Sequence, residues 1–160
     1  MDRKHRLIFL LISFFAVALD QFTKFLVRGN LDIGQSITII NKFFYISYYE
    51  NRGAAFSFLA SKDYGILILS FVSIIAVPII IYLAYKYSDS FSRLLAFALM
   101  LGGNIGNMLD RVFRGSVTDF FDFHFASYIY PTFNIADICL VVSVFIMLMT
   151  ILFEDKRRNT

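Results

Sequence analysis

Two aspartates in the C-terminal third of the chain have the residue type and placement of a catalytic pair. Asp119 precedes the last apolar run, and Asp137 falls in the first turn of the helix predicted from that run. Two carboxylates held close together cannot readily both ionise, so one keeps a proton while the other acts as a base. Such a pair can activate water for attack on an amide and protonate the leaving nitrogen. Spacing alone leaves open that each is only a helix cap or half of a salt bridge.

Further polar residues fall near the level of this pair when the predicted helices are laid across a membrane. A helix rises about 1.5 Å per residue, so the depth of each residue follows from its place in a run. The residues that converge are Asp20, Lys24, Asn51, Arg52, Asn104, Asn107, Asp110, Arg111 and Asn134. Ionisable groups at membrane depth are costly and mark function or tight pairing. We therefore expect one polar site near one membrane surface.

Some of these residues also have purely structural explanations. Asp20 and Lys24 are spaced i,i+4, so they can pair on one helix face. Gly102 and Gly106 form a small-xxx-small pattern, which favours close helix packing. No GK[ST] motif follows these glycines and no strand precedes them, so a phosphate-binding loop is not predicted.

The remaining polar residues have structural alternatives of the same kind. Asn51–Gly53 has the composition of a turn. Asp110 and Arg111 could form an ion pair at the membrane interface. Asp122 and His124 are predicted to be solvated groups in a loop. Each alternative stands on its own, but their coincidence at one depth favours a shared site.

Other catalytic constellations have less support. No Ser or Cys has a plausible His partner, and neither an HExxH motif nor a CxxC pair occurs. A metal site built from Asp119, Asp122 and His124 lacks a defined ligand spacing. If the two carboxylates activate water, the reaction needs neither a metal nor a cofactor.

Four apolar runs must position these residues. Hydrophobic residues make up 58% of the 160-residue chain, above the usual share in a soluble domain. The runs that reach the roughly 20 residues needed to span a bilayer are Leu7–Val27, Tyr64–Tyr85, Leu94–Val112 and Ile135–Phe153. The first lacks a small-x-small cleavage site, so we interpret it as a retained span. The prediction is one α-helical membrane domain, residues 1–160, with four transmembrane helices.

Charge placement predicts the orientation of these helices. Basic residues lie at both ends of the chain and in the loop that holds Lys86 and Arg93. The positive-inside rule then puts both termini in the cytoplasm and the polar site near the outer face. This placement of the net charge of +3 suits anionic lipid better than nucleic acid. Cys139 is the only cysteine, so no intrachain disulfide is possible.

The two segments expected outside are not simple linkers. Ser36–Tyr49 is rich in β-branched and aromatic residues, which predicts a small sheet or hairpin against the outer leaflet. Phe120–Tyr130 is also aromatic and is predicted as a short interfacial helix or loop. The β-rich segment could cradle a substrate.

Five sequence blocks together resemble one enzyme family. In chain order they are Asp20–Lys24, Asn51–Phe56, Gly102–Arg111, Gly115–Phe120 and Phe133–Asp137. On a four-span scaffold of this length, they resemble the bacterial prolipoprotein signal peptidases, also called lipoprotein signal peptidase or signal peptidase II. Two departures concern packing: Asn104 stands where the family commonly has a small residue, and Ile138-Cys139 replaces the common small polar choice.

The resemblance implies an aspartic endopeptidase of the bacterial inner membrane, with Asp119 and Asp137 as the catalytic dyad. Its substrates would be lipid-modified prolipoproteins, cut just before the lipobox cysteine that carries diacylglycerol. The positions expected to bind substrate or support the dyad are Asn51, Asn107, Arg111 and Asn134. The positions expected to be structural are Asp20, Lys24 and Asp110. The other partners implied are membrane lipids, and the protein is expected to be a monomer.

Two other function classes compete with the peptidase. A small transporter or ion-binding protein could use the same acidic cluster, but it predicts ionisable groups that continue to the inner side, where the runs carry almost none. A non-catalytic membrane scaffold predicts tolerance of conservative Asp→Asn changes. Substitution of the two aspartates distinguishes both classes from the peptidase.

Overall fold

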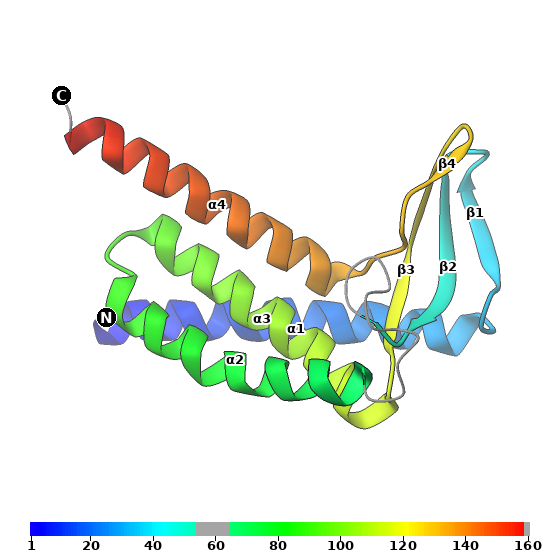
Figure 1. Ribbon diagram of the computed structural model, residues 1–160, viewed down its shortest axis with the longest axis horizontal. Helices are drawn as coiled ribbons and strands as arrows, with labels where there is room; N and C mark the ends of the chain where they lie inside the picture. Colours follow the sequence, from blue (N-terminus) through cyan, green and yellow to red (C-terminus); the bar gives the residue numbers. More distant parts are fainter. Residues whose placement is uncertain (54–64, 159–160) are drawn as a thin grey trace.

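The computed structural model describes residues 1–53 and 65–158, which form a helical bundle with a small sheet across one end (Figure 1). The elements in chain order are α1 (Arg3–Asn30), β1 (Ser36–Ile40), β2 (Phe44–Asn51), α2 (Gly65–Tyr87), α3 (Phe91–Arg114), β3 (Val117–Phe125), β4 (Tyr128–Ile129) and α4 (Ile135–Arg158). Both termini lie at the end of the bundle away from the sheet (Figure 1). Ala54–Phe56 of the second sequence block, and Tyr64 of the second apolar run, lie outside the described residues.

Local sequence signals set the ends of the helices. Asp2 caps α1, since its carboxylate accepts a hydrogen bond from the His5 backbone N–H at 2.7 Å. Ser90 caps α3 in the same way. Gly115 ends α3 in the left-handed conformation, with φ of 72°, which glycine adopts without steric cost. This turn directs the chain from α3 straight into the strand β3.

Three of the helices are long and apolar enough to cross a membrane, counting only the described residues. They are α1, α2 and the Ile135–Phe153 part of α4. Their outward faces expose many large apolar side chains, as expected of a surface that meets lipid. The structure therefore confirms a mostly helical protein with three apolar candidate spans, where the sequence predicted four.

The fourth predicted span corresponds to α3, which is enclosed by the others. It packs against α1, α2 and α4. Its exposed large apolar side chains, Phe91, Val112 and Phe113, all lie near its two ends. An enclosed helix needs fewer apolar residues, because its polar side chains can bond to neighbouring helices rather than face lipid.

Glycines let α3 approach its neighbours closely. A Cβ atom at Gly102 would lie 2.6 Å from the Cβ of Ala16 on α1. One at Gly106 would lie 2.6 Å from Asp20 Oδ2, also on α1. Neither position has room for a side chain, so the prediction that these glycines serve close helix packing is confirmed.

The sheet is antiparallel, with strand order β1-β2-β3-β4. The β-rich hairpin predicted over Ser36–Tyr49 is confirmed as β1 and β2. The prediction of an interfacial helix or loop over Phe120–Tyr130 is wrong, because most of this segment forms β3 and β4. Its aromatic residues alternate around polar ones, and this period of two lets the segment pair with β2.

A β-bulge in β2 decides which residues of that strand face the site. Ile46 pairs with Phe121, but the register then shifts so that Tyr49, rather than Tyr48, pairs with Asp119. Successive residues of a strand point to opposite faces, so one extra residue exchanges the faces for the rest of β2. The bulge therefore brings the end of β2, including Asn51, onto the face that carries Asp119.

Candidate active site

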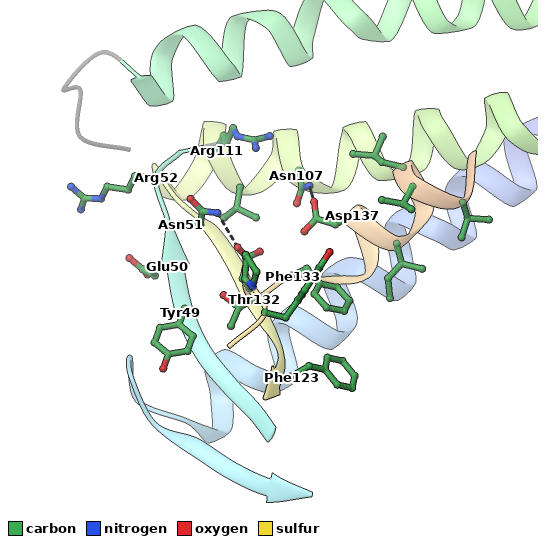
Figure 2. Close-up of a pocket in the computed structure, with 18 of the residues that line it drawn as sticks. Tyr49, Glu50, Asn51, Arg52, Asn107, Arg111, Phe123, Thr132, Phe133 and Asp137 are labelled. Carbon is green, nitrogen blue, oxygen red and sulfur yellow. Dashed lines mark hydrogen bonds between the residues drawn. The ribbon is translucent and has the colours of Figure 1, made fainter. Parts of the chain in front are cut away.

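Two elements position the predicted aspartate pair at the sheet end of the bundle. Asp119 lies on β3 and is 2% exposed. Asp137 lies in the first turn of α4. Both carboxylates line one pocket of about 1100 Å³, and Figure 2 labels Asp137 beside Asn107 in it. The structure thus brings together two residues that belong to different elements.

A capping box fixes Asp137 at the start of α4. The Asn134 side-chain oxygen accepts a hydrogen bond from the Asp137 backbone N–H at 3.0 Å. In return, Asp137 Oδ2 accepts one from the Asn134 backbone N–H at 3.1 Å. This reciprocal pattern satisfies two N–H groups that a helix start leaves unpaired. It also holds the Asp137 carboxylate in one orientation.

A chain of side-chain amides joins the two carboxylates. Asn134 Nδ2 donates to Asp119 Oδ1 at 2.7 Å and to Asn107 Oδ1 at 3.1 Å. Asn107 Nδ2 donates to Asp137 Oδ1 at 2.8 Å (Figure 2). Asn134 is fully buried and Asn107 is nearly so. Because every link is a directed hydrogen bond, the orientation of each carboxylate depends on both amides.

Asn51 completes the surroundings of Asp119 from β2. Its Nδ2 donates to Asp119 Oδ2 at 3.0 Å, and its Oδ1 accepts from the Gly53 backbone N–H at 2.8 Å. The turn that the sequence suggested for Asn51–Gly53 is therefore present, and the same side chain also reaches the site. Each oxygen of Asp119 then has one amide donor.

The environment of Asp119 favours its protonated form. Burial, and after it the nearby charge of Asp137, raise the pKa of Asp119 to about 7. Hydrogen bonds from Asn51 and Asn134 oppose this shift because they stabilise the anion. A pKa near neutrality lets a carboxyl group either hold or release a proton at physiological pH.

Arg111 is the remaining predicted site residue, and it lines the same pocket. Its Nε is buried and has no hydrogen-bond partner among the described residues. Among the described residues, Arg111 forms no ion pair with its neighbour Asp110, which instead contacts Lys24 and Arg28. Arg111 therefore keeps donor capacity in a pocket that holds two carboxylates.

The residues predicted as structural form a buried ion cluster behind the pocket. Lys24 Nζ lies 2.9 Å from Asp20 Oδ2 and 3.2 Å from Asp110 Oδ2, and all three side chains are at most 1% exposed. The i,i+4 pairing of Asp20 and Lys24 is confirmed. Sequence reasoning missed Arg28, which donates to Thr118 Oγ1 at 3.0 Å. Its i+4 spacing from Lys24 places it on the same helix face and was the available signal.

Asp122 and His124 lie elsewhere, and the prediction that they are solvated loop groups is wrong. Asp122 is a buried residue of β3 that accepts hydrogen bonds from Ser47 Oγ at 2.7 Å and, if the ring nitrogen is protonated, from His124 Nε2 at 2.9 Å. Both line a second pocket from which Asp119 is absent. In the described part of the chain, no three His, Cys, Asp or Glu side chains form a group suited to a metal.

The rest of the large pocket is mainly apolar and lies between the sheet and α4. It is also lined by Arg52, which the sequence placed among the converging polar residues, and by Tyr49 and Glu50, which sequence reasoning did not select. The apolar lining comes from Phe43, Phe123, Phe125, Tyr130, Phe133, Ile138, Leu140, Val141 and Val142. An extended or lipidic ligand can therefore lie along the apolar walls while one of its polar groups reaches the two carboxylates.

Comparison with known proteins agrees with this architecture. The sequence model of the signal peptidase (SPase) II family matches residues 12–153. The fold is similar to a bacterial membrane enzyme solved by the in meso method at 2.3 Å resolution, with a TM-score of 0.83, 31% identity, and coverage of 94% of this chain and 90% of that one. A second bacterial membrane enzyme structure, at 1.9 Å resolution, has a TM-score of 0.77, 32% identity, and coverage of 91% and 92%. The chain belongs to the signal peptidase II family of aspartic peptidases.

Proposed function

We propose that this protein removes the signal peptide from diacylglyceryl-modified prolipoproteins, cutting just before the lipidated lipobox cysteine. The family supports cleavage of lipoprotein signal peptides. The observation that carries the chemistry is the amide chain that links Asp119 to Asp137 inside one pocket. It holds two carboxylates so that a proton on one and a negative charge on the other can act together.

In this mechanism the two aspartates have different roles. Asp137 accepts two hydrogen bonds at the N-terminus of α4, where a carboxylate anion is stabilised, so it serves as the base that takes a proton from water. Asp119, whose pKa is raised to about 7 by burial and by Asp137, holds the proton that is delivered to the leaving nitrogen. The water oxygen bonds to the scissile carbonyl carbon as the C=O π bond opens, and the C–N bond breaks when this tetrahedral intermediate collapses and the nitrogen takes the proton of Asp119. The two carboxylates exchange protonation states in one turnover.

The supporting residues have roles that follow from their contacts. Asn51, Asn107 and Asn134 orient the carboxylates through the bonds described above. The Arg111 guanidinium, which lines the pocket and can only donate, is suited to a carbonyl oxygen of the substrate backbone. Apolar walls of the pocket are suited to the acyl chains and the apolar segment of a signal peptide.

The membrane arrangement that suits this reaction has four spans in the bacterial inner membrane, with α3 as the enclosed fourth. Both termini lie at the end of the bundle away from the sheet (Figure 1). We place that end in the cytoplasm, on the basis of the positive charges near it, and the pocket near the outer face. The diacylglycerol of a precursor would then meet the pocket at the level of the outer leaflet. The protein acts as a monomer within membrane lipid.

The test is processing of a diacylglyceryl-modified precursor by purified protein and by two isosteric variants, Asp119→Asn and Asp137→Asn. Loss of general acid–base catalysis typically costs about 10²- to 10⁴-fold in rate. Each variant should therefore cut the precursor at least about 10²-fold more slowly than the wild type while keeping its helical content. Asp89→Asn is a matched control, since Asp89 is an exposed partner of Arg93 in the connection between α2 and α3, which lies at the end of the bundle away from the sheet (Figure 1). Wild-type rates in either dyad variant would refute the mechanism, and equal cutting of an unlipidated precursor would refute the substrate assignment.

A further inference from the structure

Lys24 uses all of its hydrogen-bonding capacity behind the candidate site. Its ammonium group has three N–H donors, and it contacts three acceptors: Asp20 Oδ2 at 2.9 Å, Asp110 Oδ2 at 3.2 Å and Asn107 Oδ1 at 3.0 Å. The Lys24 side chain is completely buried. A lysine with three fixed partners has one position, so it can serve as a reference point for the groups that it touches.

The two carboxylates of this cluster each hold the backbone beside one dyad residue. Asp20 Oδ1 accepts a hydrogen bond from the Ala136 N–H at 2.9 Å, directly before Asp137. Asp110 Oδ2 accepts one from the Thr118 N–H at 3.1 Å, directly before Asp119. One ion cluster therefore fixes the backbone beside both aspartates, although Thr118 belongs to β3 and Ala136 to α4.

The third contact of Lys24 sets the orientation of an amide. An ammonium group can only donate, so Asn107 must present its oxygen to Lys24 and its NH₂ group to Asp137. Asn134 Nδ2 donates to the same oxygen and supports the same orientation. A reversed amide would place an oxygen against the Asp137 carboxylate and remove one of its donors.

We propose that Lys24 is a positioning residue for the dyad, acting through Asn107 and through the two carboxylates that hold Ala136 and Thr118. This inference rests on the proposed function and deepens it. It assigns to buried Lys24 the orientation of the Asp119 and Asp137 carboxylates, which Lys24 does not contact directly. A purely structural lysine would stabilise the bundle and have no separate effect on the chemical step.

The experiment separates these two roles with two variants, assayed on a diacylglyceryl-modified precursor in detergent. Lys24→Met removes the cation that Asp20 and Asp110 share, so Asp20 loses its ion pair and Asp110 keeps only the longer contacts to Arg28 at 3.5 Å and Arg114 at 4.0 Å. An uncompensated buried carboxylate destabilises a fold strongly. The second variant, Asp20→Asn with Lys24→Met and Asp110→Asn, removes all three charges together. Its two new amide oxygens can still accept from Ala136 and Thr118, so it should recover the stability that Lys24→Met loses.

The expected result is that the triple variant melts near the wild-type temperature but has a kcat lower by about 10- to 100-fold, with KM unchanged. A triple variant with wild-type kcat would overturn the proposal, since the cluster would then be structural. A rise in KM without a fall in kcat would also overturn it. Failure of the triple variant to fold would do the same, because the charges would then be needed for the fold itself.

Parallel assays keep the proposed function separate from this inference. If the wild-type protein does not cut the lipidated precursor, the proposed function fails whatever the Lys24 variants do. If the wild-type protein cuts it, Asp119→Asn does not, and the triple variant equals the wild type, only the positioning role fails. Asp89→Asn again serves as the control for the loss of a charge distant from the site.

Discussion

The hydrogen bond from Asn51 to Asp119 gives a prediction about the pH dependence of activity. Asn51 Nδ2 lies 3.0 Å from Asp119 Oδ2 and lowers the pKa of that carboxyl group, against the opposing effects of burial and of Asp137. In the proposed mechanism Asp119 must hold a proton, so the rate falls as pH rises past its pKa of about 7. Asn51→Leu removes the donor but keeps the number and the branching of the side-chain heavy atoms.

The sign and size of the effect follow from the bond that is lost. A hydrogen bond to a charged group contributes about 1.5–3 kcal/mol, and one pKa unit corresponds to about 1.4 kcal/mol. Without the Asn51 donor the Asp119 anion is less stable, so its pKa rises. In a plot of kcat/KM against pH, the fall in rate on the basic side (the basic limb) should therefore move to higher pH by about one to two units.

The assay is kcat/KM for a diacylglyceryl-modified precursor measured across pH, because this ratio reports the free enzyme. Asn104→Leu is a matched control, since Asn104 donates to the Ser73 carbonyl on α2 and makes no bond to the dyad. Its basic limb should stay in place. A basic limb that does not move in Asn51→Leu, or that moves to lower pH, would refute the assignment of the proton to Asp119.

Three further predictions concern stability and metal dependence. The folded-state pKa of Asp119, about 7, lies above the ordinary value of 3.8, so its contribution to stability is full below pH 4 and is lost as pH rises through 7. Asp119→Asn should remove this contribution, worth about 4 kcal/mol at most, which melting temperatures of the wild type and the variant at pH 5 and pH 8 would reveal. Gly106→Ala places a Cβ 2.6 Å from Asp20 Oδ2 and should cost about 1–3 kcal/mol in the free energy of unfolding, whereas Gly29→Ala, with nothing within 4 Å, should not lower the melting temperature. A metal chelator should leave precursor cleavage unchanged, and a loss restored by one added divalent ion would contradict the two-carboxylate mechanism.

Local patterns in the sequence were sufficient for the helices and for part of the ion cluster. An apolar run of about 20 residues has few alternatives to a helix in a membrane, because every backbone polar group must bond within the segment. Asp20 and Lys24 pair as predicted because an i,i+4 spacing fixes neighbours on one helix whatever surrounds it. The five sequence blocks led to the correct family because they span the chain from α1 to α4.

The sequence was misleading where a segment was both polar and aromatic. Asp122 and His124 are polar residues between aromatic ones, which suggested an exposed loop or interfacial helix. The burial of Asp122 and the place of His124 on β3 depend on pairing with β2, a partner more than 70 residues earlier in the chain. Strand propensity is decided largely by such neighbours, so a single segment cannot reveal it.

The residue types of the candidate site were thus readable from the sequence, but their mutual geometry was not. Asp119 and Asp137 stand 18 positions apart, and nothing in that spacing requires two amides to join them. The β-bulge that brings Asn51 to Asp119 is set by strand register rather than by composition. Burial, which gives Asp119 its raised pKa, exists only once β3 is enclosed by the bundle and the sheet. Sequence determined which groups are available for chemistry, and tertiary packing decided their orientation and protonation, because both depend on contacts between distant segments.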